Sequence, residues 1–265
     1  IVVFLITLGV LLHLYRVKNQ SRTFLVLSFL CFSSTLVFYQ APRAFLPFFI
    51  PLLFIFFSAK GGSAFGRHPN IFKKNIFLPV LLFLFIIIVP IIGIVTSHEL
   101  NQRIRMLSIF QHEQTKLVLE EQIRENGMNG NIVFTRLFHN KLINYSITFF
   151  ENYFHHFSYD FLLTDKGLPD RYRVPQMGIL YFFEIPLLFF GFWRLFSNNK
   201  KIASFLSLWI IIAPIGSALT FHDVPNLQRT LFIFPALSII SAYGFWELWL
   251  FFKEVKFSKI IRKKL

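Results

Sequence analysis

Long blocks of apolar residues constrain the fold of this chain more than any other feature of its sequence. A helix needs roughly 20 predominantly apolar residues to cross the hydrocarbon core of a bilayer. Hydrophobic residues make up 55% of the 265, and 38 residues are Phe, which is far more than a soluble domain of this length carries. Seven apolar blocks can be drawn, at residues 1–14, 24–39, 45–58, 76–96, 178–196, 202–220 and 231–252. The sequence therefore predicts an all-α integral membrane protein with about seven transmembrane helices.

The second and third blocks are short, and little more than Gln40-Ala41-Pro42-Arg43 separates them. Pro42 and Pro47 lie near the start of the third block, and proline is favoured in the first turn of a helix. We therefore expect two helices joined by a tight turn. One long kinked helix is the alternative.

Basic residues in the connecting segments set the expected orientation, because cytoplasmic loops carry an excess of Lys and Arg. If the C-terminal tail is cytoplasmic, alternation of the spans places most of the 27 basic residues on that side. The segment 97–177 then lies outside, where acidic residues balance the basic ones. Topology and attraction to anionic lipid head groups explain the net charge of +14, and no nucleic-acid partner is needed.

The expected organisation has four parts. Residues 1–96 form a first group of transmembrane helices, 97–177 an extracytoplasmic segment, 178–252 the last three spans, and 253–265 a basic cytoplasmic tail. Within 97–177 we expect an amphipathic helix at 114–126, an aromatic-rich interfacial helix at 132–154 and a loop at 165–170. This helical segment should form a cap on the outer ends of the spans. Because the chain begins inside an apolar block, we also expect a further part before Ile1.

Arg43 is the first candidate for a functional site, since it lies alone in the turn after Tyr39. An arginine at a membrane boundary usually extends to the lipid head groups. Its planar guanidinium equally suits a lipid phosphate or pyrophosphate.

The loop 221–230 is the second candidate, because it combines His222, Asp223, Asn226 and Arg229 between two spans. One interpretation is a solvated turn in which Asn226 or Asp223 caps a helix. The other is a phosphate or sugar site, with Arg229 at the start of the last span and His222 or Asp223 bonded to hydroxyl groups.

A third candidate combines His156, Asp160, Arg171 and Arg173 with several aromatic residues. Such a loop can contact a sugar or an acceptor, and it can equally anchor at the membrane interface. The histidines of this region have no strong metal-ligand spacing. We predict no cofactor and leave a divalent metal open.

Other polar features are less informative. Cys31 is the single cysteine, so an intrachain disulfide is impossible. Glu184 and Glu247 lie within expected spans, where a carboxylate is a functional candidate by default, and they stay unassigned.

Several short runs resemble a known family. The run 154–162, the segments 171–175 and 178–186, and the loop 223–229 before Phe234-Pro235 are similar to those of bacterial multi-pass glycosyltransferases of the GT-C type. The turn from Tyr39 to Arg43 before Leu46-Pro47 fits the same pattern. The group in question includes the protein mannosyltransferases and the lipid A aminoarabinose transferases. The matches extend roughly over residues 39–244 and are short.

This resemblance implies an outward-facing active site in a bacterial inner membrane. A sugar would move from a polyprenyl-phosphate donor to a glycan, lipid or protein acceptor. The family places its catalytic acidic residue in the first outer loop, which we expect upstream of Ile1, so no catalytic base is named here. The fragment alone is expected to be inactive. Arg43 and Arg229 would stabilise the departing lipid phosphate.

A multi-pass transporter or lipid flippase is the main alternative, and a non-catalytic membrane subunit is a further one. Transporters tend to carry broken helices and polar residues near the middle of the bilayer. Here the middles of 76–96 and 231–252 are almost purely apolar, which favours chemistry at the surface.

Overall fold

The computed structural model describes residues 1–19, 21–57, 77–111, 141–164, 173–175 and 177–262, and these residues are mostly helical. Its helices are α1 Val2–Asn19, α2 Arg22–Phe38, α3 Pro42–Phe56, α5 Phe77–Thr96, α6 His98–Leu107, α9 Lys141–His155, α10 Tyr159–Leu162, α11 Glu184–Asn198, α12 Lys200–Ile212, α13 Ile215–Ala218, α14 Leu227–Thr230 and α15 Phe234–Arg262, with short 3-10 turns at Ile109–Gln111 and Leu231–Ile233. The described residues form no β-strand, only two isolated bridges. The all-helical prediction is confirmed for this part of the chain.

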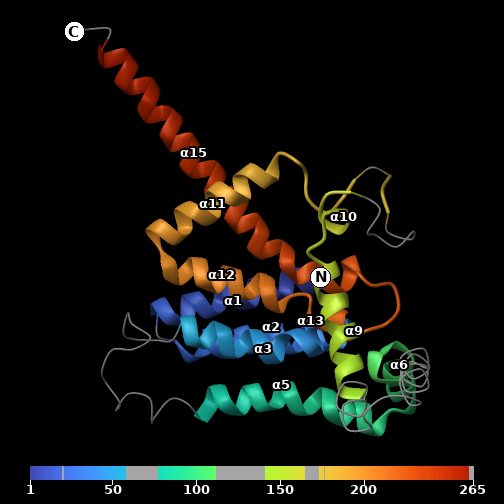
Figure 1. The fold of residues 1–265 in the computed structure, drawn as a ribbon. Helices are drawn as coiled ribbons and strands as arrows, with labels where there is room; N and C mark the ends of the chain where they lie inside the picture. Colours follow the sequence, from blue (N-terminus) through green and yellow to red (C-terminus); the bar gives the residue numbers. More distant parts are fainter. Residues whose placement is uncertain (20, 58–76, 112–140, 165–172, 176, 263–265) are drawn as a thin grey trace, which may run out of the picture.

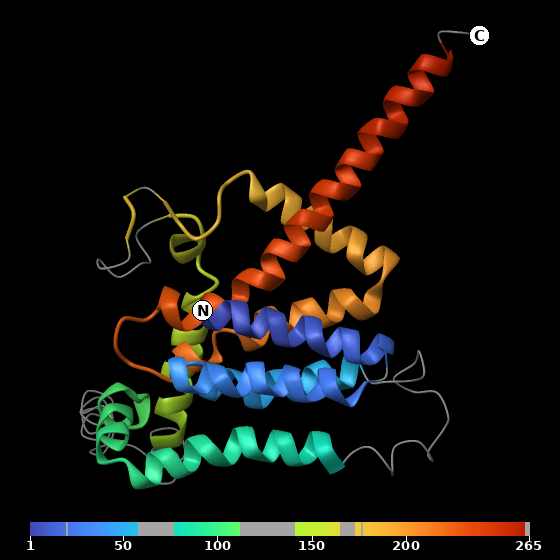
Figure 2. The ribbon, with the colours of Figure 1, turned by 180° about the vertical axis from the view of Figure 1, so that it is seen from behind.

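Five helices form a bundle. Figures 1 and 2 show α1, α2, α3, α5 and α12 side by side, with α9 lying across one end. We call this the capped end, and it also contains residues 39–41, 98–111 and 219–226. The opposite end is called the basic end, and it holds Arg16, Lys18, Arg22, Lys200 and Lys201. The expected helix at 114–126 and the loop at 165–170 lie outside the described residues, as does the first part of the expected helix 132–154.

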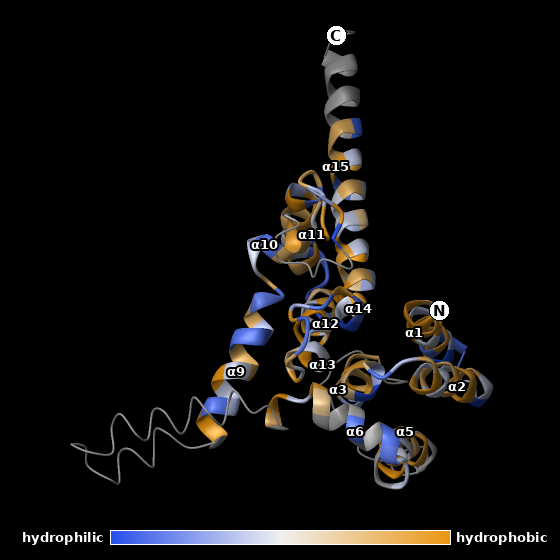
Figure 3. Ribbon diagram, turned by 90° about the vertical axis from the view of Figure 1, so that its right-hand side faces the viewer, coloured by the Kyte–Doolittle hydropathy of each residue, from blue (hydrophilic) through white to orange (hydrophobic). Residues whose placement is uncertain are grey.

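Within the described residues, three helical stretches are long and apolar enough to cross a membrane, namely Val2–Asn19, Lys200–Ala218 and Leu227–Lys253. The helices α2 and α3 are apolar but have only 17 and 15 residues. At a rise of about 1.5 Å per residue they are shorter than a hydrocarbon core of about 30 Å. Figure 3 shows the bundle helices end-on and mostly hydrophobic, while α9 also carries hydrophilic residues. Membrane association is thus supported, whereas a count of seven spans stays a prediction.

The turn between α2 and α3 decides between one kinked helix and two helices. Tyr39 is fully extended, with φ −153° and ψ 155°, and its N–H closes the last turn of α2 on Thr35 O. Pro42 then opens α3 at a position where its missing N–H costs nothing. The prediction of two helices joined by a tight turn is confirmed.

Prolines also explain why other helices begin or end inside the predicted blocks. The expected span 178–196 becomes helical only at Glu184, which puts Pro186 in the first turn of α11. The expected span 202–220 is interrupted before Pro214, and a separate turn, α13, follows. Proline removes a backbone donor and clashes with the preceding turn, so it fits the start of a helix but not its interior.

Aromatic rings fill the interior between α3, α12 and the start of α15. Phe45 stacks on Phe49 at 4.7 Å between ring centroids and on Phe232 at 4.9 Å. Trp209 lies 4.6 Å from Phe49 and donates its indole N–H to the carbonyl of Phe232 at 2.8 Å. All four side chains are fully buried or nearly so. This cluster fixes the start of α15, and therefore the loop before it, relative to the bundle.

The helices α11 and α15 cross with their backbones in contact. A Cβ added to Gly191 would fall inside the van der Waals distance of Ile240 O, and a Cβ added to Gly244 would do the same with Leu187 O. Small residues allow such close crossings in membranes, where packing rather than hydrophobicity drives the association of helices.

Candidate functional site

Polar backbone groups from two distant segments pair at the capped end. The N–H of Ile109 donates to Leu219 O at 3.2 Å, and that of Phe221 donates to Leu107 O at 2.8 Å. These bonds fasten the end of α6 to the segment that follows α13. A loop between two spans is thereby given a fixed position.

The helix α9 is fastened to the same segment by side chains. Asn152 donates its amide N–H groups to Ala218 O at 3.3 Å and to Thr220 O at 3.0 Å. The Tyr153 hydroxyl donates to Ile211 O at 2.8 Å. These acceptors lie near the ends of α12 and α13, where carbonyl groups lack intrahelical partners. The helical segment thus rests on the helix ends, and the side of a membrane that it faces stays a prediction.

Arg229 is held at the centre of this region. Its Nη1 donates to Thr220 Oγ1 at 2.6 Å and to the carbonyl of His222 at 2.8 Å. Thr220 donates in turn to Ser217 O at 2.6 Å. Among the residues that the structure describes, none accepts from Nε or Nη2 of Arg229. The guanidinium is therefore oriented by one nitrogen, and its Nε and Nη2 have no acceptor in the described part of the chain.

Asn226 has the capping role that the sequence left open. Its Oδ1 accepts from the backbone N–H of Arg229 at 3.1 Å, which makes it the N-cap of α14. Its own carbonyl accepts from the Thr230 hydroxyl at 2.7 Å. The side chain is buried, so Asn226 positions Arg229 and does not itself face a ligand.

His222 and Asp223 make the bend between Thr220 and the cap. The His222 side chain is exposed, and only its carbonyl contacts Arg229. Asp223 has φ 53°, in the left-handed region that aspartate tolerates better than most residues. The left-handed bend turns the chain back toward Asn226.

Arg43 lies at the capped end but belongs to a different element. Its Nη2 donates to Leu36 O at 3.2 Å, in the last turn of α2, where a cation suits the helix dipole. Its Nε is buried and has no hydrogen-bond partner among the described residues. No hydrogen bond joins Arg43 to Arg229 among the described residues. The elements that carry them are linked through α13, which packs on the start of α3. A Cβ on Gly216 would lie 3.3 Å from Ala44 Cβ.

His156 departs from its expected role, because the structure buries its ring completely. Nδ1 donates to Asn152 O at 2.7 Å, and the ring packs edge-on against Phe161 at 5.4 Å. Burial lowers the pKa of His156 to about 4, and the bond to the Asn152 carbonyl opposes this only in part. A neutral, buried imidazole stabilises the end of α9 and cannot contact a sugar or an acceptor in this arrangement.

The remaining candidates of the third group are less organised. Asp160 is exposed, and its Oδ1 accepts from the Thr164 hydroxyl at 3.2 Å. Arg173 is also exposed, whereas Arg171 lies outside the described residues. The structure does not bring Asp160 into the hydrogen bonds around Arg229.

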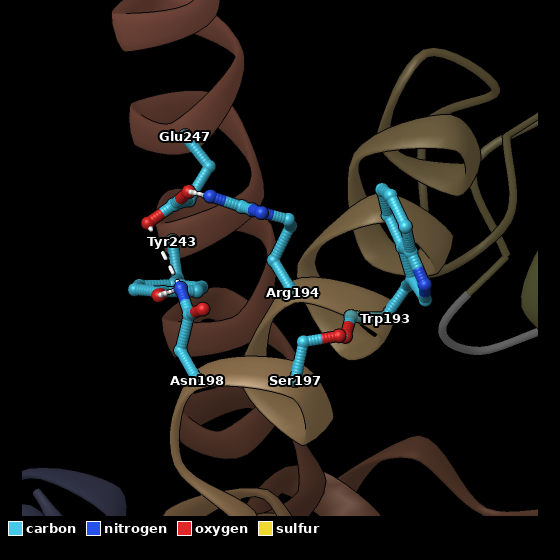
Figure 4. Close-up of polar contacts among 6 residues, drawn as sticks. All are labelled: Trp193, Arg194, Ser197, Asn198, Tyr243 and Glu247. Atoms are coloured by element: carbon cyan, nitrogen blue, oxygen red, sulfur yellow. Dashed lines mark hydrogen bonds and ion pairs between the residues drawn. The ribbon is translucent and has the colours of Figure 1, made fainter.

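Two carboxylates that the sequence left unassigned now have partners. Glu184 accepts from the Tyr181 N–H at 3.0 Å, so it closes the start of α11. Glu247 accepts from Arg194 Nε at 2.7 Å, and Asn198 donates to the Tyr243 hydroxyl beside them at 2.8 Å (Figure 4). This polar cluster joins α11 to α15.

The Arg194–Glu247 pair was not predicted, although both residues lie within expected spans. A signal was present in the spacing, since each charged residue follows a glycine of the helix crossing by three positions. Residues three apart lie on one face of a helix, so Gly191 and Gly244 bring the two charges together.

Metal ligands do not cluster in this site. Among the residues that the structure describes, no group of three or more His, Cys, Asp or Glu side chains could hold a metal ion.

Comparison with known proteins gives no family. No family model matches the chain, and neither a curated protein nor a solved structure matches it.

Proposed function

We propose that this chain is part of an integral membrane glycosyltransferase that uses a polyprenyl-phosphate sugar as its donor. The observation that carries the proposal is the Arg229 guanidinium, anchored through Nη1 by Thr220 and the His222 carbonyl beneath α9. A planar cation with free donors suits a phosphate, because it can form two parallel hydrogen bonds to the phosphate oxygens.

The proposed topology has seven spans, with the capped end outside a bacterial inner membrane and the C-terminus in the cytoplasm. The cluster of Arg16, Lys18, Arg22, Lys200 and Lys201 at one end of the bundle supports this orientation. Exposed apolar side chains on several helices, such as Phe4, Ile55, Ile91 and Phe189, support contact with lipid.

Arg229 would act when the bond between the sugar and the lipid phosphate breaks. Negative charge then grows on the phosphate, and a preoriented guanidinium stabilises it more than it stabilises the ground state. Arg43 is the second cation proposed for this task, since its Nε is buried without a described partner. A carboxylate that is not assigned among the described residues would deprotonate the acceptor hydroxyl. The proposed partners are membrane lipids, the lipid-linked sugar and a glycan, lipid or protein acceptor, with no cofactor.

The test uses the chain within its full reading frame, in membranes supplied with a radiolabelled polyprenyl-phosphate sugar. Arg229→Ala should lower transfer by a factor of about 100 or more, because one charge-stabilising donor group is lost. Gln228→Ala is the matched control, since Gln228 is an exposed neighbour on the same short helix α14. Wild-type transfer by the Arg229→Ala protein would reject the assignment.

A transporter or flippase is a second candidate, and the polar cluster around Glu247 favours it. Ionisable pairs on transmembrane helices often mark the path of a substrate or ion. In proteoliposomes a flippase would move a fluorescent lipid-phosphate sugar between leaflets without releasing the sugar. Glu247→Gln would abolish that movement in a flippase and would leave sugar transfer intact in the proposed transferase.

A further inference from the structure

The basic end contains a second cationic site, built around the last turn of α3. The guanidinium of Arg16, from α1, lies 5.3 Å from the ring centroid of Phe54. The ammonium of Lys201, from α12, lies 5.5 Å from that of Phe57. Phe54 lies in the last turn of α3, and Phe57 is the C-cap residue that directly follows this helix. Two cations from different helices thus approach neighbouring rings.

His13 fixes the position of both rings. It is fully buried, and its Nε2 donates to the carbonyl of Phe57 at 2.9 Å. Its ring meets Phe54 edge-on at 4.6 Å between centroids. Phe57 also packs edge-on against Phe205 at 4.9 Å. Several contacts therefore hold the aromatic floor of the site in place, and the two cations have no ion-pair partner among the described residues.

Arg16 lacks a counter-ion within this part of the sequence. Its Nη1 is buried and has no hydrogen-bond partner among the described residues. The sequence contains no Asp or Glu before Glu99, and the segment 58–76 after α3 is basic as well. Glu247 is already paired with Arg194. Arg16 as a whole is only partly buried, and a cation without a nearby carboxylate is stabilised by an anion that reaches the accessible part of its guanidinium from outside the chain.

The surroundings of Arg16 indicate where that acceptor comes from. Leu11, Leu14 and Tyr15 on α1 and Ile55 on α3 are exposed apolar residues of the two helices that contribute Arg16 and its ring partner Phe54. Helices with exposed apolar side chains and cations at one end fit acyl chains together with an anionic head group. Inorganic phosphate would satisfy the cations but would leave the apolar surface uncovered.

We infer that Arg16 and Lys201 bind the phosphate of one anionic phospholipid, whose acyl chains lie along α1 and α3. The guanidinium provides directed hydrogen bonds and the ammonium provides a point charge. This site lies at the opposite end of the bundle from Arg229 and does not depend on the proposed transferase activity.

Native mass spectrometry of the full chain in detergent, with added phosphatidylglycerol, tests the inference. The wild-type protein should retain one tightly bound phosphatidylglycerol, and phosphatidylcholine should not replace it. In the double variant Arg16→Gln/Lys201→Gln the apparent affinity should fall about tenfold or more, which corresponds to about 1.4 kcal/mol. The control is Lys18→Gln/Lys200→Gln, which removes the same charge from exposed lysines at the same end.

Each other outcome overturns the inference. Equal losses in the two double variants would mean that only net charge attracts lipid. Equal retention of phosphatidylcholine would remove the role of the head-group charge. Displacement of the lipid by excess inorganic phosphate would assign the site to the free ion. If the Arg16 variant does not fold, Lys201→Gln alone decides, because that lysine is exposed and its replacement should still weaken retention.

Discussion

The buried His156 makes the stability of the folded protein depend on pH. His156 is neutral in the folded protein, because burial lowers its pKa to about 4. An unfolded histidine has a pKa of about 6.5 and takes up a proton below that value. Between about pH 6.5 and 4 the unfolded state therefore binds more protons, and folding weakens as the pH falls. The contribution at stake is about 3 kcal/mol, because one pKa unit corresponds to about 1.4 kcal/mol.

The measurement is the midpoint of thermal unfolding in detergent at a series of pH values. The wild-type midpoint should fall more steeply between pH 6.5 and 4 than that of His156→Gln, which has no group to protonate. Parallel curves for the two proteins would show that His156 is not the group responsible.

Single residues also show what the sequence could not predict. Its prediction of a polar loop at 221–230 agrees with the structure only up to Asn226, because Leu227–Thr230 form the short helix α14, which contains Arg229. The sequence could not supply Thr220, Ser217 and Asn152 as the residues around it, because these contacts join segments that lie far apart in the chain. His156 was misassigned because exposure is not visible in a local run of polar and aromatic residues.

At the scale of elements, α11 and α15 cross so closely that glycine is required at the contact. Among the described helices, this is the tightest such contact. Gly191→Ala should separate the helices and destabilise the protein by about 1–3 kcal/mol, because the new methyl group would meet a backbone carbonyl rather than a movable side chain. Gly216→Ala is the control, since its added Cβ would approach only to 3.3 Å from Ala44 Cβ. Denaturant unfolding of both variants measures the difference, and equal stabilities would contradict the crossing.

The Arg194–Glu247 ion pair lies one helical turn after the two glycines and gives a separate prediction for α11 and α15. Breaking a fully buried pair costs about 3–5 kcal/mol, but the Arg194 side chain is 37% exposed, so about 1–2 kcal/mol is expected for Glu247→Gln. The double variant Arg194→Gln/Glu247→Gln should recover part of that loss. A double-mutant cycle with no coupling between the two positions would contradict the pairing.

Helices were the part of the fold that the sequence predicted best. The predicted apolar blocks coincide with every large helix of the bundle. They do so because contact with lipid and packing in the core both require apolar residues. Their ends were less predictable, since Pro186 and Pro214 shift the boundaries through backbone sterics that hydrophobicity ignores. The pairing of α11 with α15 could not be predicted, because the two glycines at their crossing matter only through contact with the other helix.

For the whole molecule, we expect the basic residues gathered at one end of the bundle to orient it in a membrane. Cys31→Ser would leave a chain without cysteine, into which one cysteine can be placed at exposed Gln228 or exposed Lys200. In sealed vesicles of known orientation, an impermeant maleimide added outside should label Gln228→Cys and not Lys200→Cys. Detergent should make both reactive. Labelling of Lys200→Cys alone would invert the proposed topology, and labelling of both in intact vesicles would oppose a membrane barrier between the ends.

The aromatic cluster under the capped end has a consequence for spectroscopy. Trp209 is 1% exposed, whereas Trp193, Trp246 and Trp249 are 62%, 57% and 58% exposed on the outer faces of α11 and α15. These are the four tryptophans of the chain. In bilayers of brominated lipid, the fluorescence of the three outer indoles should be quenched while that of Trp209 persists. Trp209→Phe should remove the persistent emission, so a single buried indole would report whether the interior of the bundle stays closed to lipid.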